Sequence, residues 1–155
     1  MMDTQIGGLP QRKNPRLRNF DYAQKNTYFV TICTKGKKYL FGSPEKHSVF
    51  GQIAYNALNE IPQHFSGVSV DHFVVMPNHI HALLSVTKTG IDLSVVVGQY
   101  KSRVTKQVRT ITPGVQVWQA SFHDHIIRNQ ADYNRIWNYI DENPIKWVDD
   151  CFYCG

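Results

Sequence analysis

The sequence is poor in cysteine and has no long hydrophobic run. Three cysteines in 155 residues are too few for the disulfide scaffold of a small secreted protein. No apolar stretch approaches the roughly 18 residues that a membrane-spanning helix needs. The opening MMDTQIGGLPQRKN also lacks the apolar centre of a secretory signal. We therefore expect a cytoplasmic protein with no membrane partner.

The composition is that of one folded domain. The 155 residues match the usual length of a single domain, and 42% of them are hydrophobic while 19% are charged. Such proportions exclude wholesale disorder. Residues 1–19 hold few apolar side chains and read as a flexible basic arm, residues 20–148 as the folded domain, and residues 149–155 as a tail.

Acidic residues are missing from two basic segments. The net charge of +5 is modest and permits a nucleic-acid partner without requiring one. Residues 10–18 contain four basic residues and no acidic residue, and so do residues 98–109. Either run can be a solvated surface, but two of them in one small domain favour a phosphate backbone as the partner.

The order of predicted elements gives the fold class. β-branched and aromatic runs predict strands at 27–34, 68–76, 79–86 and 117–127. Helical periodicity predicts helices at 49–61, ended by Pro62, at 92–109, and from an Asn129 cap to about Asn143. Asp132, three residues after the cap, suggests a weak capping box. This order predicts an α+β fold with a ferredoxin-like split βαβ antiparallel sheet and an added C-terminal helix.

Two histidines stand two residues apart in the third predicted strand. Residues at this spacing project from the same face of a strand, so His79 and His81 lie side by side while Ile80 faces the opposite side. Paired imidazoles suit a shared divalent cation. An isolated His-x-His can equally be two ordinary strand histidines.

The last predicted helix carries a tyrosine and an amide on one side. Tyr139 and Asn143 are four residues apart and flank the apolar stripe of this helix. They could lean over a metal held by the two histidines, which would help the phenol to attack a phosphate. The alternative is a half-buried tyrosine with a solvated hydroxyl.

Three blocks of sequence resemble one known family. Residues 76–83, MPNHIHAL, resemble the HUH motif (His, hydrophobic, His) of insertion-sequence transposases with a single catalytic tyrosine, the IS200-like group. Trp118-Gln119 followed by residues 121–128, SFHDHIIR, and then residues 139–144, YIDENP, resemble its REP-associated tyrosine transposase branch. The resemblance covers roughly residues 20–148.

The resemblance implies a fold, a reaction and a set of site residues. The fold is the HUH endonuclease domain. His79 and His81 match the metal ligands, for Mg²⁺ or Mn²⁺, and Tyr139 matches the nucleophile that forms a 5′-phosphotyrosine with single-stranded DNA. Asn143 stands where the wider family has a glutamine as third ligand, and it is one methylene shorter. The implied partners are hairpin or REP-like palindromic DNA and a second copy in a homodimer.

Other residues are secondary candidates. The basic residues that we expect to contact DNA are Arg12, Lys13, Arg16, Arg18, Lys101 and Arg103. Aromatic residues that could stack on unpaired bases or belong to the core are Tyr22, Trp118 and Phe122. His123 and His125 are possible site neighbours, and Cys151-x-x-Cys154 is half of a zinc pattern that we expect to lie in the tail.

Two other functions stay open from the sequence. A replication initiator or relaxase would use the same chemistry, but those proteins carry larger additional parts. A non-catalytic hairpin-binding protein on the same fold would bind DNA with strong salt dependence and without a metal.

Overall fold

The computed structural model of the chain describes residues 26–144. The predicted arm at 1–19 and the predicted tail at 149–155 lie outside these residues. So do the four arm cations, Tyr22 and the Cys151-x-x-Cys154 pattern.

A four-stranded antiparallel sheet forms the centre of the described part. The elements along the chain are β1 (Asn26–Cys33), the short 3₁₀ helix η2 (Lys35–Lys37), α1 (Val49–His64), β2 (Val68–Val75), β3 (His79–Val86), α2 (Leu93–Ile111), β4 (His123–Ile126) and α3 (Gln130–Glu142). The strand order is β2-β3-β1-β4, and every neighbouring pair is antiparallel. This confirms the predicted ferredoxin-like α+β architecture.

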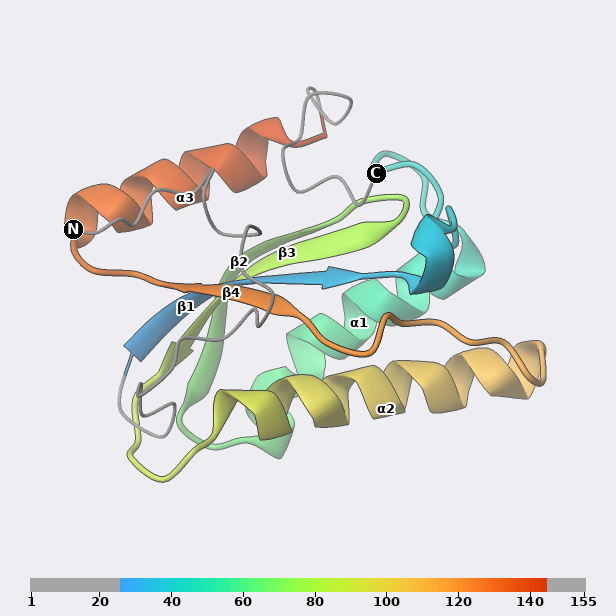
Figure 1. Cartoon of the computed structure of the whole chain (residues 1–155), viewed down its shortest axis with the longest axis horizontal. Coiled ribbons are helices and arrows are strands. Elements are labelled where there is room, and N and C mark those ends of the chain that lie inside the picture. The colour runs from blue at the N-terminus through green and yellow to red at the C-terminus, as the bar shows by residue number, and fades with distance from the viewer. Residues whose placement is uncertain (1–25, 145–155) are drawn as a thin grey trace.

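The two faces of the sheet carry different helices. Figure 1 shows α1 and α2 together on one side of the sheet and α3 on the other. Alternating residues of β3 divide between these sides, because Ile80, Ala82 and Leu84 belong to the core cluster under α1 and α2. Leu83 instead packs with Ile136 and Ile140 of α3. The face of the sheet opposite α1 and α2 is therefore covered by the added helix α3.

Side-chain caps explain where the two core helices begin. The Ser48 hydroxyl accepts a hydrogen bond from the Gly51 amide at the start of α1, and the Asp92 carboxylate accepts one from the Ser94 amide at the start of α2. The α2 face that meets the sheet is apolar and includes Val96, Val97, Tyr100, Val104 and Val108, all buried. In the part of the chain that the structure describes, no helix is long and apolar enough to cross a membrane.

The prediction that Pro62 ends the first helix was wrong. Helix α1 contains Pro62 and runs on to His64, where the Phe65 amide donates to the Ile61 carbonyl. Proline costs a helix one backbone donor and fits the helical φ angle. Because less than one turn follows Pro62, the lost bond affects the last turn only.

The predicted strand 117–127 was too long. Regular pairing is confined to β4, and Trp118 makes only an isolated bridge to Thr34. The reason is competition from α2, because the Lys101 ammonium donates to the Gln119 carbonyl at 2.8 Å and the Trp118 indole N–H donates to the Lys101 carbonyl at 3.1 Å. These bonds tie the segment to α2, while the Gln119 amide still donates to the Cys33 carbonyl at the end of β1, so the pairing around Trp118 stays a single bridge.

Candidate active site

The two histidines of β3 lie side by side on the face of the sheet that α3 covers. Their ring centroids are 4.7 Å apart, and both residues are fully buried. The predicted shared orientation of His79 and His81 is therefore confirmed. Burial of two titratable rings is unusual in a core and points to a function for them.

Neighbouring side chains fix the orientation of both imidazoles. The Nδ1 of His79 lies 2.7 Å from the Oδ1 of Asn78, an acceptor, so Nδ1 carries the proton. The Nδ1 of His81 lies 2.9 Å from the hydroxyl of Thr31, directly across on β1. With each Nδ1 engaged in this way, Nε2 is the nitrogen that each ring can offer to a cation.

Helix α3 brings Tyr139 to these histidines within the same chain. The ring centroids of Tyr139 and His81 are 5.5 Å apart, and Phe29 contacts both rings at 6.0 and 5.2 Å. Phe29 lies under α3 in the apolar cluster with Leu83. Tyr139 thus packs against His81 of its own chain.

Asn143 ends the helix one turn beyond Tyr139. Its side-chain amide donates to the Tyr139 carbonyl at 2.9 Å, which directs the amide group back along the helix. The Oδ1 atom is buried and has no hydrogen-bond partner within residues 26–144. A buried amide oxygen of this kind is costly unless something satisfies it. An oxygen ligand to a divalent cation is one way to do so.

The donor set available for a metal is small. Within residues 26–144, no three His, Cys, Asp or Glu side chains gather into a group that could hold an ion. The possible ligands are therefore the two imidazoles and the buried Asn143 oxygen, a mixture of nitrogen and oxygen that suits Mn²⁺ or Mg²⁺ with further positions open to substrate or water.

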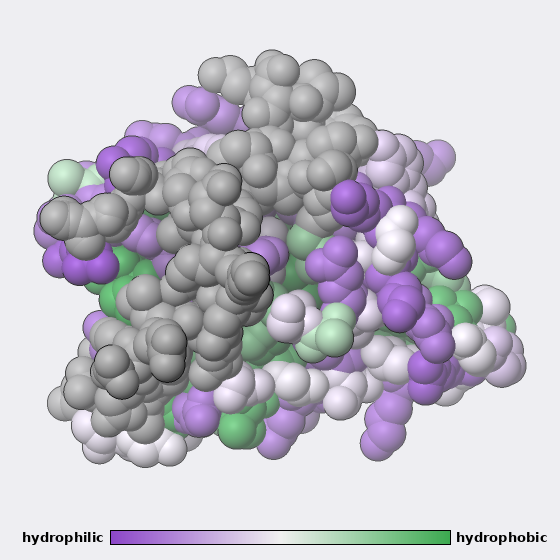
Figure 2. Space-filling view, in the orientation of Figure 1, coloured by the Kyte–Doolittle hydropathy of each residue, from purple (hydrophilic) through white to green (hydrophobic). Residues whose placement is uncertain are grey.

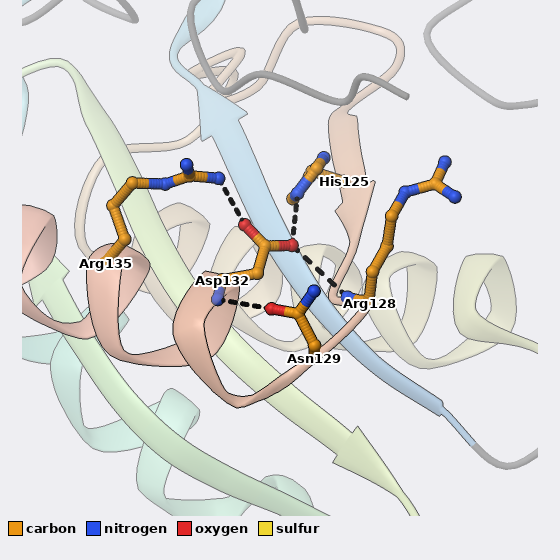
Figure 3. Close-up of polar contacts among 5 residues, drawn as sticks. All are labelled: His125, Arg128, Asn129, Asp132 and Arg135. Carbon is orange, nitrogen blue, oxygen red and sulfur yellow. Dashed lines mark hydrogen bonds and ion pairs between the residues drawn. The ribbon is translucent and has the colours of Figure 1, made fainter. Parts of the chain in front are cut away.

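A buried carboxylate anchors the first turn of α3 (Figure 3). The Asp132 carboxylate lies 2.9 Å from the Nε2 of His125 on β4 and accepts the Arg128 amide at 3.2 Å, and Arg135 binds its other oxygen. The Asp132 amide donates to the Asn129 side chain, as the predicted cap requires. The capping box is only half formed, because the Asp132 carboxylate is held by its other partners.

This network holds Asp132 charged and His125 neutral. Burial lowers the pKa of His125 below its ordinary value, outweighing the opposite influence of Asp132. Burial alone would raise the pKa of Asp132, but hydrogen bonds from His125, the Arg128 amide and the Arg135 side chain outweigh it and lower that pKa. The neutral imidazole donates to the carboxylate, so the contact is a charge-assisted hydrogen bond.

Two further contacts tie α3 to β2. Asp71 accepts a hydrogen bond from the Tyr133 hydroxyl at 2.8 Å, and burial together with this carboxylate raises the pKa of Tyr133 to about 12. His72 stacks on Trp137 with centroids 4.2 Å apart, and its Nε2 lies 2.6 Å from Asp141. A register shift between Val70 and His72 marks a bulge at this point of β2.

The sequence did not reveal these anchors. Asp71 and Tyr133 are 62 residues apart, and His72 and Asp141 are 69 apart. No local spacing connects such pairs. A signal existed only in the pair Asp71-His72, which interrupts an otherwise apolar strand pattern.

The residues that we expected to contact DNA differ in how far the structure buries them. Lys101 bonds the Gln119 carbonyl, and burial lowers its pKa. The Nε and one terminal nitrogen of Arg103 are buried without a hydrogen-bond partner among the described residues. Trp118 packs on Phe41 and Tyr100, and Phe122 is buried in the same cluster, so both belong to the core.

The chain is similar to a known family and to known proteins. The model of the family described as "Transposase IS200 like" matches residues 23–143, which include all four candidate site residues. An uncharacterized protein of Haemophilus influenzae is 31% identical over 175 aligned positions, covering 94% of this chain and 95% of that protein. A REP-associated tyrosine transposase of Escherichia coli is 33% identical over 82 positions, 51% of this chain and 47% of that protein.

Solved structures share the fold. The structure of a REP-associated tyrosine transposase bound to a REP hairpin aligns with a TM-score of 0.66 and 24% identity, covering 88% of this chain and 78% of that one. A structure from Deinococcus radiodurans aligns with a TM-score of 0.56 and 19% identity over 82% of this chain and 95% of that one. The resemblance that the sequence motifs indicated is thereby confirmed.

Proposed function

The chain belongs to the family of IS200-like transposases, and we propose that it cleaves and rejoins single-stranded DNA beside hairpins with Tyr139 as the nucleophile. The observation that carries this proposal is the contact of Tyr139 with His81, 5.5 Å between ring centroids, beside the buried pair His79–His81. A tyrosine that packs against one of two adjacent, oriented imidazoles supplies the groups that this chemistry requires.

His79, His81 and Asn143 would hold the divalent ion of the reaction. When bound, Mg²⁺ or Mn²⁺ supplies a Lewis acid that polarises the scissile phosphate. The chain's own residues prepare for it, because Asn78 and Thr31 orient the two rings. The unsatisfied Oδ1 of Asn143 adds an oxygen donor on the helix that carries the nucleophile.

Tyr139 performs the covalent step. Its phenolic oxygen forms a bond to the phosphorus while the bond between phosphorus and the 3′ oxygen breaks. The phenol loses its proton, and the departing strand leaves with a 3′-hydroxyl. Because the phosphotyrosine keeps the energy of the ester, a later 3′-hydroxyl can attack it and restore a DNA strand without ATP.

We propose hairpin DNA as the partner. The support is the branch to which the relatives belong, since one aligned structure is of a REP-associated tyrosine transposase bound to a REP hairpin. Tyr139 contacts His81 of its own chain, which supports a site formed within one chain. The expected homodimer stays a prediction, which sedimentation with and without DNA tests.

A covalent-adduct assay tests the function. Labelled single-stranded hairpin DNA is mixed with the protein, with Mn²⁺ or with chelator, and run on a denaturing gel. We expect a metal-dependent shifted band that is absent in Tyr139→Phe. The matched control is Tyr55→Phe, since Tyr55 lies in α1 on the opposite side of the sheet.

Each outcome decides between functions. An adduct that persists in Tyr139→Phe contradicts the assignment of the nucleophile. Tight binding of hairpins by the unaltered protein without any adduct favours the non-catalytic hairpin-binding protein.

A further inference from the structure

A basic, aromatic turn follows β1. Lys35, Lys37 and Lys38 occur within four residues, Tyr39 comes next, and all four side chains are exposed. Tyr39 is 60% exposed, more than most large hydrophobic side chains of the described part. Figure 2 shows hydrophilic surface where Figure 1 places η2.

Backbone hydrogen bonds attach this turn to the candidate active site. The Thr34 amide and hydroxyl both donate to the Asn78 carbonyl, at 3.0 and 3.1 Å. The side chain of the same Asn78 accepts from His79. The Lys35 amide donates to the Val117 carbonyl at 2.9 Å and secures the other side. The turn therefore keeps a fixed position relative to His79.

Clefts adjoin the turn on two sides. One of about 440 Å³ is lined by Tyr39, Pro44, Pro77 and Pro144 among others. Pro77 directly precedes Asn78 and Pro144 directly follows Asn143, so this cleft lies at the rim of the site. Another of about 560 Å³ is lined by Lys35 and Lys38 over the apolar side chains Leu40 and Phe50.

The backbone of the turn is strained at a lysine. Lys37 has φ 61°, and within the described residues it is the one non-glycine residue with a positive φ. A lysine in this region is less favourable than glycine or asparagine. Gly36 has φ 64°, and the Lys38 amide donates to the Lys35 carbonyl at 3.5 Å, so the positive φ of Lys37 belongs to a tight turn of the kind that needs positive φ at both central residues. The turn presents the Lys37 side chain to solvent.

We propose that residues 35–39 bind the unpaired DNA strand that leads into the active site. Tyr39 stacks on a base in the 440 Å³ cleft, and Lys37 and Lys38 contact neighbouring phosphates. Glu45 also lines that cleft, so the phosphates lie on the lysine side and the base in the cleft. This inference rests on the proposed function and adds where the substrate strand runs.

An unpaired strand fits these features better than a duplex. An exposed aromatic ring beside a cleft is useful only to a base that is not already stacked, and single-strand sites combine such rings with cations. In a duplex the bases are already stacked, so this surface would meet phosphates alone. The lysines could bind those phosphates without any contact from Tyr39.

The test compares two DNA probes by fluorescence anisotropy. One is a hairpin with a single-stranded extension, and the other is the same hairpin without it. We expect Tyr39→Ala to weaken binding of the extended probe by about 5- to 100-fold and to leave the blunt probe nearly unchanged. The double variant Lys37→Ala with Lys38→Ala should make the dependence of binding on salt concentration less steep for the extended probe. The slope of log K against log salt concentration should fall by the amount expected for about one to two phosphate contacts.

Matched controls separate binding from folding. Tyr55→Ala removes a partly exposed tyrosine from α1, and Lys88→Ala removes a lysine near the opposite end of β3, where its ammonium contacts Ser66. Neither should distinguish the two probes. Lys37→Gly relieves the backbone strain while removing the side chain, so it should be at least as stable as the unaltered protein yet bind the extended probe less well.

The outcomes separate this inference from the function on which it rests. Equal losses on both probes, or no loss on either, overturn the assignment of residues 35–39 even if the unaltered protein forms its tyrosine adduct. If the unaltered protein binds neither probe and forms no adduct, the proposed function fails and the strand path fails with it.

Discussion

The two faces of the sheet are built on different principles. Under α1 and α2 lies one continuous apolar cluster drawn from all four strands. Under α3, the apolar cluster of the described residues has four buried members, Phe29, Leu83, Ile136 and Ile140. Partly buried hydrophobic side chains surround it, and histidines, hydroxyls and carboxylates lie among them on that face.

This difference separates stability from chemistry. Burial of apolar area stabilises the α1–α2 face without fixing any polar group in place. On the α3 face, directional bonds set the orientation of the rings, because a hydrogen bond specifies an angle as well as a contact. The strand β3 serves both faces through its alternation, with Ile80 on one side and His81 on the other.

The largest expected effect on stability is on the apolar face. Ile80→Ala should lower the free energy of unfolding by about 2–5 kcal/mol, because it leaves a cavity in a fully buried position. The neighbouring His81→Gln keeps a polar group of similar size and should cost clearly less, while abolishing the tyrosine adduct. Urea unfolding and the adduct assay measure the two effects. If His81→Gln destabilises as much as Ile80→Ala, the division between the faces does not hold.

The next effect concerns the buried carboxylate of α3. Asp132→Asn should lower stability by about 1–3 kcal/mol at neutral pH, because it weakens a charged acceptor with several donors. Because the pKa of Asp132 is lowered in the folded state, its contribution to stability is fully present at pH values above the ordinary pKa of a carboxyl group. That contribution is lost as the pH falls through the pKa of Asp132 in the folded state.

A pH series checks this sign. The stability difference between the unaltered protein and Asp132→Asn should be present at about pH 7 and should shrink below about pH 3.9. The lowered pKa of His125 adds a loss of stability below about pH 6.5, since the unfolded state then binds the proton more readily, and this loss should be larger in Asp132→Asn because Asp132 opposes the lowering. A difference that is constant with pH contradicts the charged state assigned to Asp132.

The apolar face was largely readable from the sequence. Periodicity of 2 in β3 and near 3.6 in α2 reports burial directly, because both patterns follow from backbone geometry. The errors came where tertiary contacts compete with local preference. Lys101 binds the Gln119 carbonyl beside Trp118, so that regular pairing is confined to β4, and α1 continues beyond Pro62.

The candidate site was predictable only in part. His79, His81 and Tyr139 occur in motifs with fixed spacing, and the structure brings them together. The groups that hold α3 over them were not predictable, because Asp71 and His72 meet partners more than 60 residues away. A bulge in β2 aims these side chains, and the sequence carries no clear sign of it.

Removal of one orienting group should have an intermediate effect on chemistry. Asn78→Ala deletes the acceptor of the His79 proton but keeps the backbone carbonyl that binds Thr34. We expect Mn²⁺ affinity and the adduct rate to fall about 10- to 100-fold, with little loss of stability. Calorimetric titration with Mn²⁺ and single-turnover adduct formation measure both quantities. Unchanged metal affinity would falsify the orienting role of Asn78.

The smallest expected effect is at the exposed end of α3, where His72 contacts Asp141. Asp141 is half exposed, so the pair should contribute about 0.2–1 kcal/mol to stability. His72→Phe keeps a ring to stack on Trp137 and removes the polar contact, whereas Asp141→Asn weakens the contact from the other side. A double-mutant cycle therefore isolates the pair from the stack.

The adduct rate makes this small effect informative. Trp137 and Asp141 flank Tyr139 in the sequence, so loosening the contact between His72 and Asp141 should disturb the position of Tyr139. We expect the rate of adduct formation to fall several-fold more than the loss in unfolding free energy alone would account for. Ser69→Ala, which removes a hydroxyl on the same strand that contacts Asp71, serves as the control for β2. The contrary result is a rate of adduct formation that follows the unfolding free energy in both the contact variants and Ser69→Ala. In that case the polar contacts of the α3 face contribute to folding alone, as the apolar contacts of the other face do, and the two faces differ in composition but not in role.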